Sequence, residues 1–277
     1  QSGQCVALHD PRRHADYVRR WGEDPGLFCA IYRAWANDWL GHRNRALRQM
    51  EQTISLALNL SNQYSQASTL ALAAHLYRLR EEPHKVLDLT EQAIRIGEAD
   101  GVVQWLAWAK IHRGWALAAT GDSDAGYELC SEGIDDYTHA GIRLQLPYLY
   151  SMLAETLDRC DLPEEALSRL GAGVDIVKNV NYGVLVPEFY RQQGCLLYRL
   201  SRMELAEQAF RAGIKIAAEQ QAKTLELRTA LPFARMLRDL GRTKDAKAIL
   251  VPAHSALREG SDTADLRESD VLIRSLG

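Results

Sequence analysis

Tryptophans and arginines are the side chains of this sequence with the clearest capacity for chemistry, and both suit binding better than catalysis. Trp and Arg supply much of the energy at protein interfaces, and the arginine fork pairs with carboxylates and phosphates. Here they recur at helical spacing, which places them on one face of successive helices. The predicted binding face is made of Phe28, Trp35, His75, Arg78, Trp108, His112, Trp115, Tyr148, Glu155, Arg191, Gln192, Arg228, Arg235 and Arg238.

The predicted face changes in character along the chain, from aromatic to rich in arginine. Residues 181–241 carry nine basic and six acidic side chains, although the whole chain is acidic. We expect the face to hold an extended or helical protein segment, from a partner or from the parent chain. Its apolar part would lie near Trp35 and Trp115 and its acidic part near Arg235.

Two alternatives to this hypothesis stay open. The tryptophans could pack between repeats while the arginines pair with neighbouring acids. Alternatively, Trp35, Trp108 and Trp115 could stack on a sugar or a short peptide in a small-molecule sensor.

Residue patterns typical of catalysis or cofactor binding are scarce. The sequence has neither a Gly-x-x-x-x-Gly-Lys-Ser/Thr phosphate loop nor a His-Glu-x-x-His metal motif. Gly171-Ala172-Gly173 resembles a glycine-rich loop, but it falls inside a predicted helix. Glu155 and Asp158 could form an acid pair, although a solvated or ion-paired face is the simpler interpretation. We therefore predict a protein that is not an enzyme and has no cofactor and no metal.

Composition narrows the possible partners. The net charge of −3, from 33 basic and 36 acidic residues, argues against nucleic acid. No apolar stretch is long enough to span a membrane, and the first residues lack the features of a signal peptide. The five cysteines are widely spaced and without Cys-x-x-Cys, which favours thiols in a reducing, cytoplasmic setting. The chain begins in the middle of the repeat pattern, so we expect it to be a piece of a longer protein. A homodimer is an open alternative to a single copy.

The elements that position these residues follow from a 40-residue recurrence of residue size. Six turn positions recur at this interval: Gly41, Glu81, Gly121, Asp161, Ser201 and Gly241. Small residues lie seven before, five after and twelve after each turn, and an isoleucine or valine follows the third small residue in five of the six repeats. Helices that cross closely need such small side chains. The recurrence therefore predicts an all-α, right-handed superhelical solenoid of helical hairpins.

Each predicted hairpin has a helix A, a tight turn and a helix B. The A helices are expected near 25–40, 64–80, 103–120, 146–160, 184–200 and 223–240. The B helices are expected near 43–60, 83–99, 123–140, 163–180, 202–219 and 243–258. The repeats then run over 25–60, 64–99, 103–140, 146–180, 184–219 and 223–258. Residues 1–24 are interpreted as the end of a preceding repeat, and 259–277 as a loop and capping helix.

The repeats resemble the tetratricopeptide (TPR) family. Tyr150-x-x-Leu153-Ala154-x-x-Leu157 resembles its helix A pattern, and Ala206-x-x-x-Phe210 its helix B pattern. Two departures are the length, which is 40 residues where the family has about 34, and the missing proline at the end of helix B.

A narrower resemblance rests on three pairs of segments. The pairs are Asp24-Pro25-Gly26 and 32–36, 105–108 and 113–117, and 221–228 and 262–266. They are similar to the C-terminal repeat region of bacterial proteins that join a class III adenylate/guanylate cyclase, or another output domain, to a STAND-type ATPase. The resemblance implies a sensing or autoinhibitory array that governs the ATPase or cyclase through its contacts.

Overall fold

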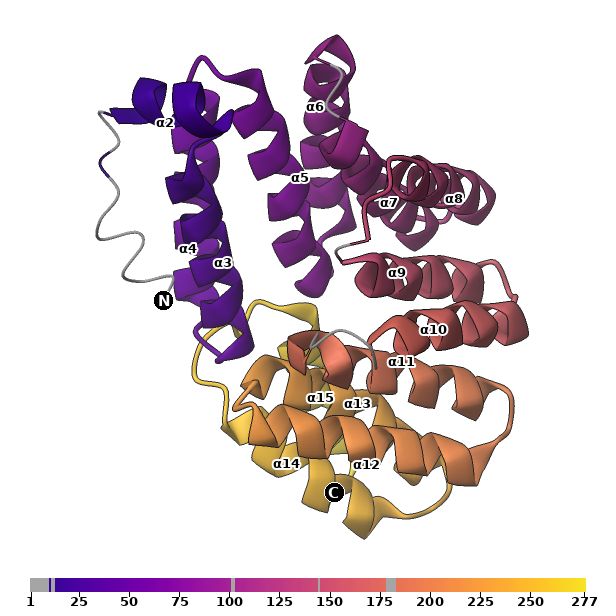
Figure 1. The fold of residues 1–277 in the computed structure, drawn as a ribbon. Coiled ribbons are helices and arrows are strands. Elements are labelled where there is room, and N and C mark those ends of the chain that lie inside the picture. The colour runs from indigo at the N-terminus through magenta and orange to yellow at the C-terminus, as the bar shows by residue number, and fades with distance from the viewer. Residues whose placement is uncertain (1–9, 11–12, 101–102, 144, 178–182) are drawn as a thin grey trace. The chain divides into compact units, whose positions relative to one another are not determined.

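The protein is described by a computed structural model that covers residue 10 and residues 13–100, 103–143, 145–177 and 183–277. Every regular element in these residues is a helix, and the all-α prediction is confirmed (Figure 1). The chain forms two compact units, which are described separately below. Unit 1 comprises 1–38 and 43–144, and unit 2 comprises 39–42 and 145–277.

Unit 1 consists of a short first helix and three helical hairpins. Within the described residues, the first helix is α2 (His14–Trp21). The A helices are α3 (Pro25–Trp39, whose last residue belongs to unit 2), α5 (Gln63–Leu79) and α7 (Val103–Ala119). Their B partners are α4 (Arg43–Leu58), α6 (Pro83–Asp100) and α8 (Ser123–His139). Each helix of the three hairpins falls within a few residues of its predicted range.

Unit 2 repeats the same plan three times and adds a final helix. Its A helices are α9 (Leu146–Arg159), α11 (Val186–Arg199) and α13 (Lys223–Asp239). Its B helices are α10 (Pro163–Val177), α12 (Met203–Glu219) and α14 (Thr243–Ser255). A short 3-10 turn, η2 (Gly183–Leu185), precedes α11. The last helix, α15 (Ala264–Ser275), packs on α13 and α14.

The predicted turn positions adopt the left-handed conformation that ends a helix. Their φ angles are 58° at Glu81, 62° at Asp161 and 59° at Ser201, and the other three are glycines with positive φ. After the turn, the backbone N–H of Arg202 donates to the carbonyl of Leu197 at 2.8 Å. That bond, which recurs after other turns, defines the Schellman end of a helix. The turn therefore needs a left-handed residue more than it needs glycine.

The predicted small residues lie where helices cross. Gly114 on α7 and Gly126 on α8 are the closest case, because a Cβ on Gly114 would stand 2.5 Å from the carbonyl oxygen of Gly126. The isoleucine row that follows the third small position is not uniformly buried. Ile134 is 5% exposed, whereas Ile54 and Ile214 are only half-buried. Close backbone approach, more than these isoleucines, therefore sets the hairpin packing.

The cysteines follow the sequence prediction only in part. Cys130, Cys160 and Cys195 are thiols, but Cys29 on α3 is disulfide-bonded. The prediction that all cysteines are thiols is therefore wrong for Cys29, and Cys5 lies outside the described residues. Among the described residues, no helix is long and apolar enough to cross a membrane.

Candidate functional site

In unit 1, the predicted binding face is a stack of aromatic and imidazole rings from three A helices. Trp35 on α3 meets His75 on α5 with ring centroids 4.6 Å apart. His75 lies 6.4 Å from His112 on α7, which stacks at 5.0 Å on Trp108. The indole N–H of Trp108 donates to the carbonyl oxygen of Ala71 at 2.9 Å and so ties α7 to α5. The stack holds consecutive A helices together.

Two further members of the predicted face extend this stack. The guanidinium carbon of Arg78 lies 5.6 Å from the centroid of the Trp115 ring, which is within range of a cation–π interaction.

His112 is fully buried, and its Nδ1–H donates to the carbonyl of Trp108 at 2.9 Å. Burial, with the nearby Arg78 charge, lowers the pKa of His112 to about 3 in spite of that hydrogen bond. His112 is therefore neutral at physiological pH.

The aromatic residues of the face are mostly core residues. Trp35, His75, Arg78, Trp108, His112 and Trp115 are each less than 5% exposed, and Tyr148 in unit 2 is 2% exposed. Phe28 is half-buried, with its ring 5.7 Å from that of Trp105. This is the packing that the alternative interpretation expected for Trp35 and Trp115. A ligand would reach these rings only after neighbouring side chains moved.

In unit 2, the same face consists of ion pairs that link the three A helices. Arg191 on α11 donates to Glu155 on α9 at 2.5 Å and to Glu188, one turn earlier on α11, at 2.7 Å. Arg228 on α13 donates to Glu188 at 3.2 Å. Burial alone would lower the pKa of Arg191, but the Glu188 and Glu155 carboxylates raise it well above its ordinary value. The array is charged throughout and mostly buried.

Glu188 belongs to this array but is absent from the set of binding residues proposed above. Glu188 and Arg228 lie 40 residues apart, at equivalent positions of consecutive repeats. Opposite charges at one repeat position are therefore the sequence signal that predicts such a pair.

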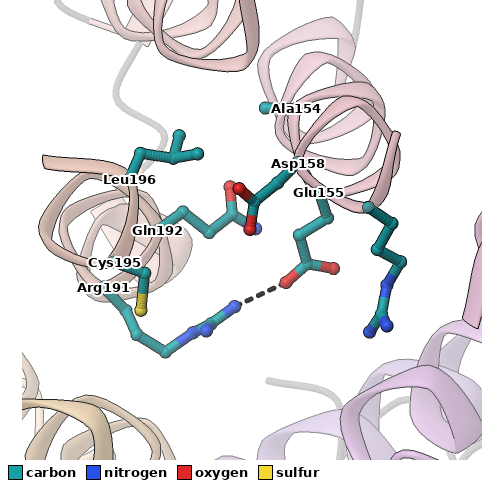
Figure 2. Close-up of a pocket in the computed structure, with 8 residues that line it drawn as sticks. Ala154, Glu155, Asp158, Arg191, Gln192, Cys195 and Leu196 are labelled. Atoms are coloured by element: carbon teal, nitrogen blue, oxygen red, sulfur yellow. Dashed lines mark hydrogen bonds and ion pairs between the residues drawn. The ribbon is translucent and has the colours of Figure 1, made fainter. Parts of the chain in front are cut away.

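Beside this array, α9 and α11 enclose a cavity of about 240 Å³. Figure 2 shows side chains from both helices converging on it, with the Glu155–Arg191 pair joining its walls. The lining residues are Ala154, Glu155, Asp158, Arg159, Arg191, Gln192, Cys195 and Leu196. Three of the predicted site residues, Glu155, Arg191 and Gln192, therefore meet here. Arg159 also lines the cavity but is absent from the predicted set.

Gln192 and Cys195 determine the chemistry of the cavity wall on α11. Gln192 is 3% exposed, and neither its Oε1 nor its Nε2 has a hydrogen-bond partner among the described residues. Burial raises the pKa of the Cys195 thiol to about 11, so the sulfur is protonated and a poor nucleophile. No group of acidic, His or Cys side chains in the described part of the chain could hold a metal ion. The wall offers hydrogen bonds and charge.

Arg235 and Arg238 lie on α13, at the exposed end of the predicted face. Arg235 pairs with Glu268, and Arg238 pairs with Asp239 at 2.8 Å, with both arginine side chains more than 40% exposed. Surface pairs of this kind contribute little net stability. Both arginines could therefore exchange their partner for an acidic ligand at small cost.

Solved structures with a similar fold are helical-repeat proteins of low sequence identity. A Rap protein complexed with competence and sporulation factor has a TM-score of 0.63 at 10% identity, over 90% of this chain and 74% of the other. NprR in complex with its cognate peptide NprX has a TM-score of 0.64 at 11% identity, over 90% and 69%. Aspartyl phosphate phosphatase F from Bacillus subtilis has a TM-score of 0.53 at 10% identity, over 95% and 73%.

These likenesses define the class of fold. No protein-family model matches the chain, and a search of curated proteins found no match. The chain has the fold of a TPR-like helical solenoid.

Proposed function

We propose that this chain is a non-catalytic module that binds a protein or peptide segment on the A-helix face of unit 2. The observation that carries the proposal is the polar cavity between α9 and α11, which is lined by residues of that face. NprR, which shares the fold, was solved with its cognate peptide, and a Rap protein with competence and sporulation factor. Those ligands belong to those proteins, but they support a peptide as the class of ligand for this fold.

The make-up of the cavity favours a peptide over a sugar. Sugar sites commonly use an exposed aromatic ring as a stacking surface, and the lining of this cavity contains none. Trp35, Trp108 and Trp115, which a small-molecule sensor would use, are buried in unit 1. A peptide needs hydrogen-bonding groups and charges, which the cavity supplies.

We expect an acidic part of the ligand to lie along α13. Arg235 and Arg238 present guanidinium groups there, and their present partners are exposed carboxylates that a ligand carboxylate would replace. Arg228 is committed to Glu188 inside unit 2 and would act by holding that helix in place.

The test is selection of peptides from a randomised dodecapeptide library on the intact chain, followed by affinity measurement. The variant Arg235→Glu/Arg238→Glu should weaken acidic peptides at least tenfold, because it replaces attraction by repulsion at two positions. The matched control is Arg169→Glu/Arg211→Glu, which makes the same charge change at exposed arginines of α10 and α12. Failure to select any peptide would refute the function, and equal weakening by both variants would refute the placement on α13.

We further propose that this binding regulates a signalling ATPase or a nucleotide cyclase of the same protein. The support is the resemblance of three parts of the chain to repeat regions of bacterial cyclase–STAND ATPase proteins. The test is ATPase or cyclase activity of the full-length parent protein with and without a selected peptide. An activity that responds neither to the peptide nor to deletion of the repeats would refute the regulatory role.

A further inference from the structure

Gln192 is a buried polar side chain of unit 2 to which the described residues supply no side-chain hydrogen bond. Its carboxamide offers two donors and an acceptor, yet neither Nε2 nor Oε1 has a partner among the described residues. Native structures bury such groups with partners, because an unmade hydrogen bond in the interior destabilises the fold. A buried side chain without hydrogen-bond partners in the wall of a cavity is what we expect where a ligand supplies the missing hydrogen bonds.

The neighbouring groups are already engaged elsewhere. Glu155 is bound to Arg191, and Oδ1 of Asp158 accepts from Arg199 at 2.6 Å. Figure 2 shows the Gln192 side chain directed from α11 toward the space between the two helices. Nε of Arg191, the preceding residue, is likewise buried without a partner among the described residues. The unused hydrogen bonds of α11 are thus concentrated at residues 191 and 192, on the cavity side.

We propose that the Gln192 carboxamide binds the main chain of an extended peptide, pairing with the N–H and the C=O of one peptide residue. In an extended strand, the N–H and C=O of one residue point to the same side. A carboxamide presents an acceptor and a donor side by side, so it matches that pair with two hydrogen bonds. This inference rests on the proposed function and deepens it, because it names the ligand group and the residue that reads it.

The charges of the cavity lining favour an uncharged ligand group beside Gln192. The cavity lining carries two carboxylates, Glu155 and Asp158, and two guanidinium groups, Arg159 and Arg191. Such a balanced lining gives no net attraction to an anion or a cation, whereas the dipoles of a peptide bond fit between the two signs. The main chain binds here independently of sequence, and the side chains that flank it on α13 supply the preference for acidic residues.

The experiment uses Gln192→Met, which keeps the length of the side chain and removes both hydrogen-bonding groups. The probe is the panel of dodecapeptides selected on the unmodified chain. We expect the affinity for every peptide of the panel to fall at least tenfold, while the urea midpoint of the chain stays equal or rises, because a buried unpaired amide has been removed. The matched control is Gln193→Met, the next residue on the same helix, which should bind the panel normally.

A second measurement works on the unmodified chain and does not depend on how the variant folds. Each backbone N–H of one selected peptide is methylated in turn, and the affinity of each methylated peptide is measured. One position should lose at least tenfold in affinity, and this loss should shrink severalfold in Gln192→Met.

The outcomes separate the two proposals. If the panel binds Gln192→Met as tightly as it binds the unmodified chain, or if no single methylation is critical, the role of Gln192 is overturned and the binding function stands. If the unmodified chain selects no peptide, the binding function is overturned and the role of Gln192 with it.

Discussion

Acid should destabilise unit 1 through one residue, His112. The side chain is fully buried on α7, and its neighbours in the stack are Trp108, His75 and the Arg78 guanidinium. Arg78 is cationic and opposes a second positive charge. The folded protein holds His112 neutral, with a pKa of about 3, whereas the ordinary pKa of histidine is 6.5. As the pH falls, His112 is therefore protonated in the unfolded chain before it is protonated in the folded protein.

The sign and the size of the effect follow from these two values. The lowered pKa means that the contribution of His112 to stability is complete above pH 6.5 and is lost progressively as the pH falls toward about 3. Each pH unit in that window removes about 1.4 kcal/mol from the free energy of unfolding. Between about pH 7.5 and pH 5, His112 therefore costs unit 1 about 2 kcal/mol.

The assay compares urea unfolding of the unmodified chain and of His112→Asn at the two pH values. Asn keeps a donor for the Trp108 carbonyl but does not titrate, so the acid loss should shrink by about 2 kcal/mol in this variant. Hydrogen exchange of α7 amides assigns the change to unit 1, since a repeat protein can unfold in parts. His139→Asn, at an exposed position of α8, is the control and should keep the full acid loss.

A measurement on the unmodified chain covers the case in which His112→Asn does not fold. The imidazole proton resonances of His112 should stay unchanged from about pH 7.5 to pH 5, because its pKa lies below this range. Titration of His112 within that range would refute the argument, as would an acid loss that is equal in the unmodified chain and in His112→Asn.

Three further predictions concern packing and charge. Gly114→Ala should lower the free energy of unfolding in urea by about 2 kcal/mol, because the new methyl group meets the backbone oxygen of Gly126 and forces α7 away from α8. An unchanged urea midpoint would contradict the close approach of the two helices. Gly171→Ala, in α10 with no atom within 4 Å of the new methyl group, should instead stabilise unit 2 by up to about 1 kcal/mol through helix propensity, and a lower midpoint would count against it. Glu188→Leu should cost about 3 kcal/mol because it leaves Arg228 buried without its carboxylate, and adding Arg228→Met should recover most of this loss; a double variant as unstable as the single one would disprove the pairing.

The sequence was sufficient to predict the helices, the turns and the close crossings. The turn at Asp161 shows why, since the helix ends there in a left-handed residue although the position is not a glycine. The 40-residue register, and not the residue type, identified it. Gly114 and Gly126 were likewise identified by their register, and the structure places each against the backbone of the other helix.

Side-chain accessibility could not be predicted in the same way. Helical periodicity shows which residues share a face, but not how closely the next A helix approaches that face. In unit 1 the Trp108 indole reaches the backbone of α5, so the approach is close and the face becomes core. The pairing of Arg235 with Glu268 was also unpredictable, because it depends on where α15 packs.

The repeat register explains why a cavity lies between α9 and α11. The position that holds Trp35, His75 and Trp115 in unit 1 holds Glu155 on α9, Cys195 on α11 and Arg235 on α13 in unit 2. The three large rings of unit 1 are buried and occupy the space beside neighbouring A helices. A carboxylate and a thiol at the same position are smaller, and their helices enclose a cavity that Gln192 and Arg191 border with unused hydrogen bonds. The residues at a single repeated position thus distinguish the packed A helices of unit 1 from the pair in unit 2 that encloses a cavity.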